Sequence, residues 1–111
     1  MLTEIRTNIY KIDDEPFAIT PRAFTENNDI KVNFQYHSGL LKLNEGDNVE
    51  IKIYLDEKPE EKSYSYLMNG MIYEKEIDHF KSSFGGLLME YQGNTEGVEK
   101  GQKIHVAIQK I

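Results

Sequence analysis

Apolar and polar residues alternate with a period of two in two segments of the chain. These segments cover residues 30–36 and 49–55, and their apolar positions are Ile30, Val32, Phe34, Tyr36, Val49, Ile51, Ile53 and Leu55. Because successive side chains of a strand point to opposite faces, the pattern predicts two half-buried β-strands. Segments rich in β-branched and aromatic residues predict further strands over residues 8–12, 17–24, 64–77, 87–91 and 104–111.

The pattern also limits the amount of helix. No stretch keeps the apolar period of 3.6 residues, so we expect little helix, at most one turn within 40–43 or around 76–81. Turn residues separate strands of similar length, as at Ser38-Gly39 and over 44–47. We therefore predict an all-β protein that forms a single, closed or partly closed antiparallel barrel with a meander or Greek-key strand order.

Two positions complicate the assignment of strands. Pro21 interrupts the segment 17–24 and cannot donate a ladder hydrogen bond, so we predict that this strand lies at an edge or beside a bulge. Asn69-Gly70 divides the segment 64–77 and is typical of a tight hairpin turn. The alternative is one long strand with a glycine bulge, which bends the strand and helps a barrel to close.

Composition is that of one globular domain. The chain has 111 residues, of which 39% are hydrophobic and 29% charged, and it predicts a single domain over 1–111. The acidic segment 56–63 is expected to be a short, solvated connector loop. No run approaches the roughly 20 apolar residues of a membrane helix, and the first residues resemble no signal or transit peptide. We expect no membrane segment and no targeting segment.

The net charge limits the possible partners, and the absence of cysteine limits the possible sites. The formal net charge of −6 repels phosphate groups, so a basic protein surface is a more plausible partner than DNA. The chain has no cysteine, which excludes disulfides and thiolate metal sites and agrees with a reducing compartment.

The residues predict no catalytic, cofactor-binding or metal-binding site. His37, His79 and His105 lie far apart, with no partner at the spacing of a metal site, and His79 is expected in an exposed turn. His105 is expected on the face opposite to its apolar neighbours Ile104 and Val106. Ser83 precedes a double glycine but lacks the order of a nucleophile elbow, and we assign no catalytic residue and no cofactor.

Aromatic residues on predicted strands permit a second interpretation. Stacking platforms of barrels that bind single-stranded nucleic acid have such residues, here Phe34, Tyr36, Tyr64, Tyr66, Tyr73 and Tyr91. Those platforms also need a basic groove, and these strands contain few lysines or arginines. Packing in and around the barrel is therefore the favoured role of the aromatic residues.

The segment 83–93, SFGGLLMEYQG, contains a double glycine that leads into an apolar strand. The glycines provide backbone freedom or allow another chain to approach closely. A β-branched residue at Gly86 is expected to occupy space that only hydrogen can fill. Along the strand that follows, alternation places Leu87, Met89 and Tyr91 on one face and the two intervening residues on the other.

Two segments resemble signatures of one family, the small common subunit shared by nuclear RNA polymerases I, II and III, to which an archaeal subunit is related. Segment 83–93 resembles an aromatic-Gly-Gly-Leu-Leu-Met run that ends in Gln-Gly or Glu-Gly. Segment 66–73, YLMNGMIY, resembles a second signature of the same family, and the two occur in the family's order. A looser likeness extends over nearly the whole chain, including Ile12-Asp13, Gly46-Asp47 and 104–111.

The resemblance implies a fold, a partner and a location. It implies a barrel resembling an oligonucleotide-binding (OB) fold with additional strands, and one continuous strand through 66–73 with a bulge at Gly70. It implies a subunit without chemistry that docks on the largest polymerase subunit in the nucleus, or in the cytoplasm if the source is archaeal. We expect no homo-oligomer and no base-specific contact with nucleic acid. The expected partner-binding residues are Tyr73, Phe84, Gly85, Gly86, Leu87, Leu88, Met89, Glu90 and Tyr91.

The chain departs from the family at three points. The connector 56–63 replaces a long insertion, which makes the chain a reduced form. Glu90 stands where the family usually has arginine, and Asn69 replaces an aromatic residue. Two other functions remain as alternatives: a free-standing barrel that binds single-stranded nucleic acid, and a small hydrolase that uses Ser83.

Overall fold

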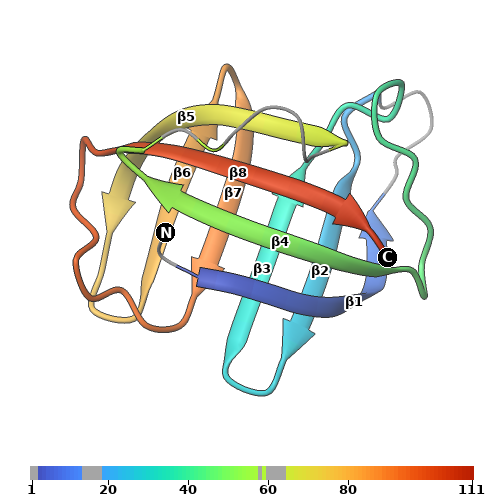
Figure 1. Ribbon diagram of the computed structural model, residues 1–111, viewed down its shortest axis with the longest axis horizontal. Helices are drawn as coiled ribbons and strands as arrows, with labels where there is room; N and C mark the ends of the chain where they lie inside the picture. Colours follow the sequence, from blue (N-terminus) through green and yellow to red (C-terminus); the bar gives the residue numbers. More distant parts are fainter. Residues whose placement is uncertain (1–2, 14–18, 58, 60–64) are drawn as a thin grey trace.

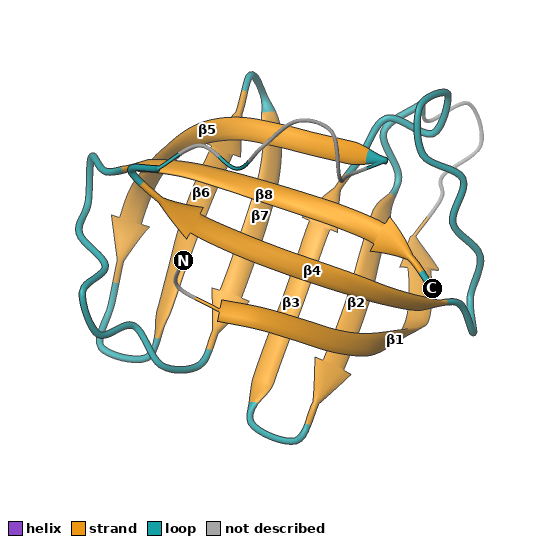
Figure 2. Ribbon diagram, in the orientation of Figure 1, coloured by secondary structure: helices purple, strands orange, loops and turns teal. Residues whose placement is uncertain are grey.

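The computed structural model describes residues 3–13, 19–57, 59 and 65–111. Within these residues the chain forms eight antiparallel strands and no helix (Figure 2). The strands are β1 (Thr3–Asp13), β2 (Arg22–Asn27), β3 (Ile30–Gln35), β4 (Asn48–Leu55), β5 (Tyr66–Lys75), β6 (His79–Phe84), β7 (Leu87–Gln92) and β8 (Lys103–Lys110). The prediction of an all-β protein with little helix is confirmed.

The strands close into one barrel. Their order is β1-β2-β3-β7-β6-β5-β8-β4, and β4 pairs with β1 to complete the circle. Strands β5, β8, β4 and β1 form one layer and cross a second layer of β6, β7, β3 and β2 (Figure 1). The expected antiparallel barrel is confirmed, and its architecture is consistent with an OB-like barrel. Because a closed barrel has no edge strand, all eight strands are paired on both sides.

The barrel consists of two Greek-key halves with the same internal pairing. In the first half β4 lies beside β1 in the order 4-1-2-3, and in the second β8 lies beside β5 in the order 8-5-6-7. Asn8 pairs with Glu26 and Asn48, as Met71 pairs with Ser83 and Lys103. The halves are thus related by a pseudo-twofold operation, and their two hairpins, β2–β3 and β6–β7, point to opposite ends of the barrel (Figure 1).

A bulge occurs at the same place in each half. The register between β1 and β2 shifts between Ile9 and Lys11, and the register between β5 and β6 shifts between Ile72 and Glu74. The extra residues are Tyr10 and Tyr73, both exposed at the surface. Bulges bend and twist a strand, which allows a small sheet to close on itself.

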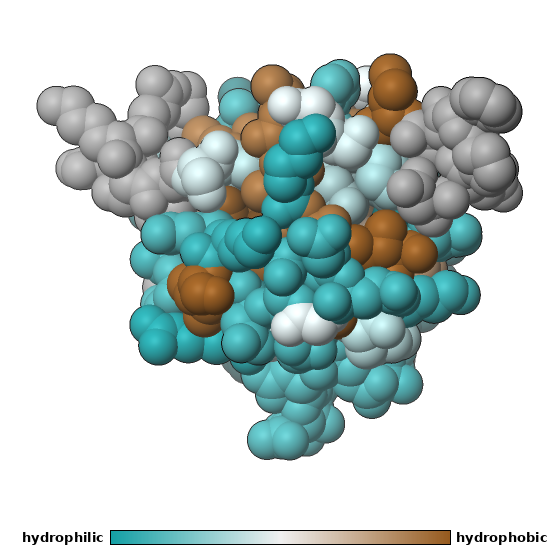
Figure 3. Space-filling model, turned by 90° about the vertical axis from the view of Figure 1, so that its right-hand side faces the viewer, coloured by the Kyte–Doolittle hydropathy of each residue, from teal (hydrophilic) through white to brown (hydrophobic). Residues whose placement is uncertain are grey.

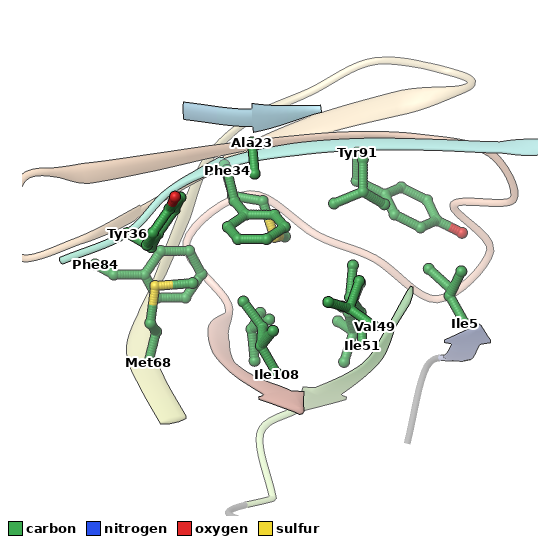
Figure 4. Close-up of a cluster of buried hydrophobic side chains, with 14 of the residues drawn as sticks. Ile5, Ala23, Phe34, Tyr36, Val49, Ile51, Met68, Phe84, Tyr91 and Ile108 are labelled. Carbon is green, nitrogen blue, oxygen red and sulfur yellow. The ribbon is translucent and has the colours of Figure 1, made fainter. Parts of the chain in front are cut away.

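Inward side chains of all eight strands fill the barrel (Figure 4). The two strands predicted from alternation contribute as expected, and β4 and β8 supply equivalent inward residues at Val49, Ile51, Ile53, Ile104, Val106 and Ile108. Phe80 and Tyr91 stack with ring centroids 4.8 Å apart. The core is therefore continuous across both halves, and the fold needs no disulfide to support it.

Several predicted elements require correction. Residues 79–84 form strand β6, where we expected at most one helical turn around 76–81, and His79 begins this strand instead of lying in a turn. Residues 40–43 contain no helix either; the amides of Leu40 and Leu41 instead donate to the carbonyl of His37 in a turn. Strand β2 begins one residue after Pro21 and pairs with both β1 and β3, so the edge placement is wrong, whereas the alternative placement beside a bulge, that of β1, is confirmed. The carbonyl of Pro21 accepts a hydrogen bond from the amide of Tyr36.

Some predictions concern residues that lie wholly or partly outside the described ranges. These are most of the connector 56–63, residues 17 and 18 of the second predicted strand, and Tyr64. On β8, His105 lies outward between the buried Ile104 and Val106, as predicted.

Candidate functional site

The two signature segments lie side by side in the second half of the barrel. Segment 66–73 belongs to β5, and segment 83–93 forms the end of β6, the following turn and β7. Strand β6 pairs with both β5 and β7. Asn69-Gly70 does not form a hairpin, so the continuous strand that the resemblance implied is confirmed. The bulge lies at Tyr73, however, and not at Gly70.

Gly85 and Gly86 form the two-residue turn of the β6–β7 hairpin. Phe84 pairs with Leu87 across the turn, and the glycines have φ angles of 64° and 102°. Positive φ at both central positions is the requirement of a type I′ turn, which matches the twist of the flanking strands. A Cβ atom at either glycine would meet no atom of this chain within 4 Å. Within the chain these glycines therefore supply backbone freedom. The space beside Gly86 is open in this chain, and the close approach of another chain at this glycine stays a prediction.

Close approach occurs instead at Gly70. A Cβ atom there would lie 2.1 Å from the backbone oxygen of Ser83 and 2.7 Å from the ring of Phe84. The equivalent residue in the first half is Thr7, whose hydroxyl donates to the carbonyl of Glu26 over 3.2 Å. Strands β5 and β6 thus approach each other at a point where only hydrogen fits, while β1 and β2 are spaced for a side chain.

The expected partner-binding residues divide between the core and the surface. Phe84, Met89 and Tyr91 are buried inside the barrel, and Leu87 packs partly against the core. The outward group consists of Tyr73, Gly85, Gly86, Leu88 and Glu90. In the folded domain a partner could contact the outward group and the half-buried Leu87, and their role remains a prediction.

Glu90 lies in a polar ladder that runs across the outer face of the barrel. A guanidinium nitrogen of Arg22 donates to the side-chain oxygen of Asn33, whose amide donates to Glu90 over 3.4 Å. Lys81, paired with Glu90 across β6 and β7, forms an ion pair of 3.3 Å with Glu74. This hydrogen-bonded pair, with the nearby charge of Glu90, raises the pKa of Lys81. Glu90 therefore has electrostatic partners within its own chain.

A groove of about 690 Å³ lies beside this ladder. Tyr10, Phe24 and Lys31 contribute from the first half, and His79 and Lys81 from β6. The rings of Tyr10 and Phe24 lie 6.3 Å apart, and the ammonium group of Lys11 lies 5.3 Å from the Phe24 ring. Sequence reasoning missed this cluster because a single sequence does not show that the strands of Tyr10, Phe24 and Lys31 are neighbours.

Most of the aromatic residues considered for base stacking are unavailable. Phe34, Tyr36, Tyr66 and Tyr91 are buried, which confirms packing as their role, while Tyr73 is exposed. Burial also raises the pKa of Tyr91, whose hydroxyl donates to the carbonyl of Asn94 over 3.1 Å.

The hydroxyl of Ser83 has no base among its cross-strand neighbours. Those neighbours are Met71 on β5 and Leu88 on β7. The rings of His79 and His105 instead interact with Asp78 and Asn69 respectively. Among the described residues no group of three histidine or carboxylate side chains could hold a metal ion.

Comparison with known proteins gives no family assignment. No protein-family model matches the chain, and no curated protein matches it.

No helix in the part of the chain that the structure describes is long and apolar enough to cross a membrane. The end of the barrel in Figure 3 is mostly hydrophilic, with hydrophobic residues exposed in several separate places. The molecule is thus defined by its class, a closed eight-stranded antiparallel barrel of OB-like architecture.

Proposed function

We propose that this chain is a non-catalytic structural subunit of a DNA-directed RNA polymerase, and that it docks on the largest subunit. The observation that carries the proposal is the pair of signature segments, which occur in the family's order and lie on neighbouring strands. Outward residues from both segments share one face of the barrel, including Tyr73, Leu88 and Glu90. One surface could thus present both signatures to one partner.

The architecture also suits a docking role. A closed barrel with a continuous core is a rigid body, so little conformational entropy is lost when it binds. The proposed subunit would stabilise the transcription complex through contact alone, in the nucleus or, for an archaeal source, in the cytoplasm. A reduced form without a long insertion would keep the barrel as its docking module.

Co-purification tests the proposal directly. The tagged chain would be expressed in its source cells and purified at moderate salt, and the recovered proteins identified by mass spectrometry. We expect the largest polymerase subunit and its associated subunits in stoichiometric amounts. Recovery of the chain as a lone monomer would overturn the proposal, provided that the tagged chain supports growth when it replaces the native one.

The groove that contains Tyr10 and Phe24 favours one other candidate, a barrel that binds single-stranded nucleic acid. An exposed ring, Tyr10, and a half-buried one, Phe24, next to Lys11 and Lys31 are the kind of groups that stack on bases and contact phosphates. Acidic residues also line the groove, at Asp78 and Glu90. Titration with labelled oligonucleotides separates the two candidates. The subunit proposal predicts negligible binding at low salt, whereas affinity that falls steeply as salt rises would favour the alternative.

A further inference from the structure

The pseudo-twofold relation places two equivalent rows of side chains on the outer surface. The first, which we call the apolar row, crosses six strands through the residues Lys103, Met71, Ser83, Leu88, Gln35 and Arg22. The second, the polar row, crosses the six equivalent strands through the residues Asn48, Asn8, Glu26, Lys31, Gln92 and His79. Each residue of one row has its counterpart at the same place in the other.

The rows differ most at their three central positions. Met71, Ser83 and Leu88 stand where the polar row has Asn8, Glu26 and Lys31, respectively.

Side chains of the polar row bind one another within the chain. Lys31 and Glu26 form an ion pair of 3.9 Å, and the amide of Asn8 donates to Asn48 over 3.2 Å. In the apolar row half of the Met71 surface is likewise open to solvent, and Leu88 is half-buried.

The fold itself does not require apolar residues in this row. The polar row shows that the same strand pairings accept an amide, a carboxylate and an ammonium group at the equivalent outward positions. Exposed apolar side chains contribute little to the stability of the isolated barrel, and clusters of them mark interaction sites. The difference between the rows therefore points to a contact that only the second half makes.

The charge at one end of the apolar row indicates the chemistry of its partner. Lys103 carries a positive charge there, and the row contains no carboxylate; Arg22, at the other end, already donates to Asn33 in the ladder that includes Glu90. The polar row has one lysine and one glutamate, so its central charges cancel. On a chain with a net charge of −6, the apolar row therefore combines an apolar centre with a cationic end at Lys103.

We propose that the apolar row docks an acidic, apolar segment of the largest polymerase subunit, an inference that rests on the proposed function. Apolar side chains of that segment would cover Met71 and Leu88, and a carboxylate would face Lys103. From Lys103 to Leu88 the row crosses four neighbouring strands at a spacing of about 4.8 Å, a length of about 14 Å, which an extended segment of about four residues matches. Both signatures contribute to this row, since Met71 belongs to one, and Ser83 and Leu88 to the other.

A triple variant that gives the apolar row the central residues of the polar row, here called the transplant, tests whether the apolar row is the docking surface. The triple variant Met71→Asn, Ser83→Glu, Leu88→Lys installs residues that the barrel already accepts at equivalent positions. The matched control replaces the polar row's Asn8, Glu26 and Lys31 by alanine. Each tagged variant is expressed in the source cells, and the amount of largest subunit recovered per molecule of bait is measured. Thermal melting of the purified variants checks their folding.

We expect the transplant to recover at least roughly tenfold less of the largest subunit than the wild type, since central apolar contacts dominate interface energy. The control should recover as much as the wild type. Melting temperatures within about 5 °C of the wild type would exclude unfolding as the cause. For a transplant that unfolds, the single variants Met71→Asn and Leu88→Lys replace it, and each should reduce recovery.

A charge reversal tests the chemistry of the partner segment. Lys103→Glu should reduce recovery severalfold, with the loss greatest at low salt, whereas the same change at Lys31 should have no effect. Equal recovery by the transplant and the wild type would overturn the assignment of the face while leaving the proposed function intact. Failure of the wild type to recover the largest subunit would instead overturn the proposed function.

Discussion

Two buried hydroxyl groups occupy equivalent positions and have different surroundings. Thr25 on β2 donates to the carbonyl of Val32 over 2.9 Å, whereas Ser82 on β6 is fully buried and its hydroxyl has no hydrogen-bond partner in the structure. A buried polar group without a partner costs roughly 1–3 kcal/mol, while a satisfied one contributes roughly 1 kcal/mol. A buried hydroxyl group at equivalent positions therefore stabilises one half of the barrel and destabilises the other.

Single substitutions at these positions should have opposite effects. Ser82→Ala should raise the free energy of unfolding by about 1 kcal/mol, because it removes an unsatisfied group. Thr25→Val should lower it by about 1 kcal/mol, because it removes a satisfied one. Urea denaturation with a common m value measures both changes. A destabilised Ser82→Ala variant would contradict the account.

The glycines of the signature segments should also respond differently to substitution. Gly70→Ala places a Cβ atom against the backbone of Ser83 and should destabilise the barrel by about 2–3 kcal/mol. Gly85→Asn should be nearly neutral, because Asn-Gly is a favoured type I′ turn, and Gly86→Val should cost about 1–3 kcal/mol through its positive φ. Thermal or urea denaturation of the three variants ranks them by stability. A Gly70→Ala variant as stable as the wild type would refute the close approach of β5 and β6.

At the scale of the strands, sequence reasoning succeeded where alternation was complete. Strands β3 and β4 have three and four apolar residues, respectively, at every second position, and both were predicted within about two residues of their observed ends. Strand β6 was missed because Ser82 replaces an apolar residue between Phe80 and Phe84, which hides the same pattern. A polar residue that is buried by the tertiary fold thus removes the local signal of the strand.

The candidate site, too, could be predicted only in part from local sequence patterns. Alternation correctly placed Met89 and Tyr91 on one face of β7 and Leu88 on the other, but could not say which face was inside. Arg22 and Lys103, the two end residues of the apolar row, lie outside the signatures in sequence and were not predicted. They join the site only through long-range strand pairing, which a single sequence does not reveal.

At the scale of the whole molecule, surface charges join strands that are distant in sequence. Burial alone would raise the pKa of Glu50 on β4, but a hydrogen bond from Arg6 on β1 and the charge of Lys52 outweigh it and lower the pKa. The backbone amide of Asn44 lowers the pKa of Asp47, and Lys110 on β8 adds to this effect. These carboxylates therefore connect β1, β4 and β8 only while they are ionised.

The stability of the barrel should consequently depend on acid pH. Carboxylates with a lowered folded-state pKa stabilise the protein above their unfolded-state pKa, and this contribution is lost as pH falls through the folded-state value. We expect the free energy of unfolding to decrease between about pH 5 and pH 3. Asp47→Asn should be less stable at neutral pH and show a shallower decrease, as urea titrations at several pH values would measure. An unchanged slope in this variant would contradict the role of Asp47.

The sequence by itself determined the class of fold, because alternation, turn residues and the absence of a helical period are local properties that each strand carries. It also contained the two segments that resemble signatures of a known family, and the glycines that their backbone needs. Only the tertiary structure decided which glycine permits close approach, which face of β7 is inside, and that the halves repeat one pairing scheme. These features depend on which strands become neighbours when the barrel closes, and closure is set by packing among residues far apart in the chain.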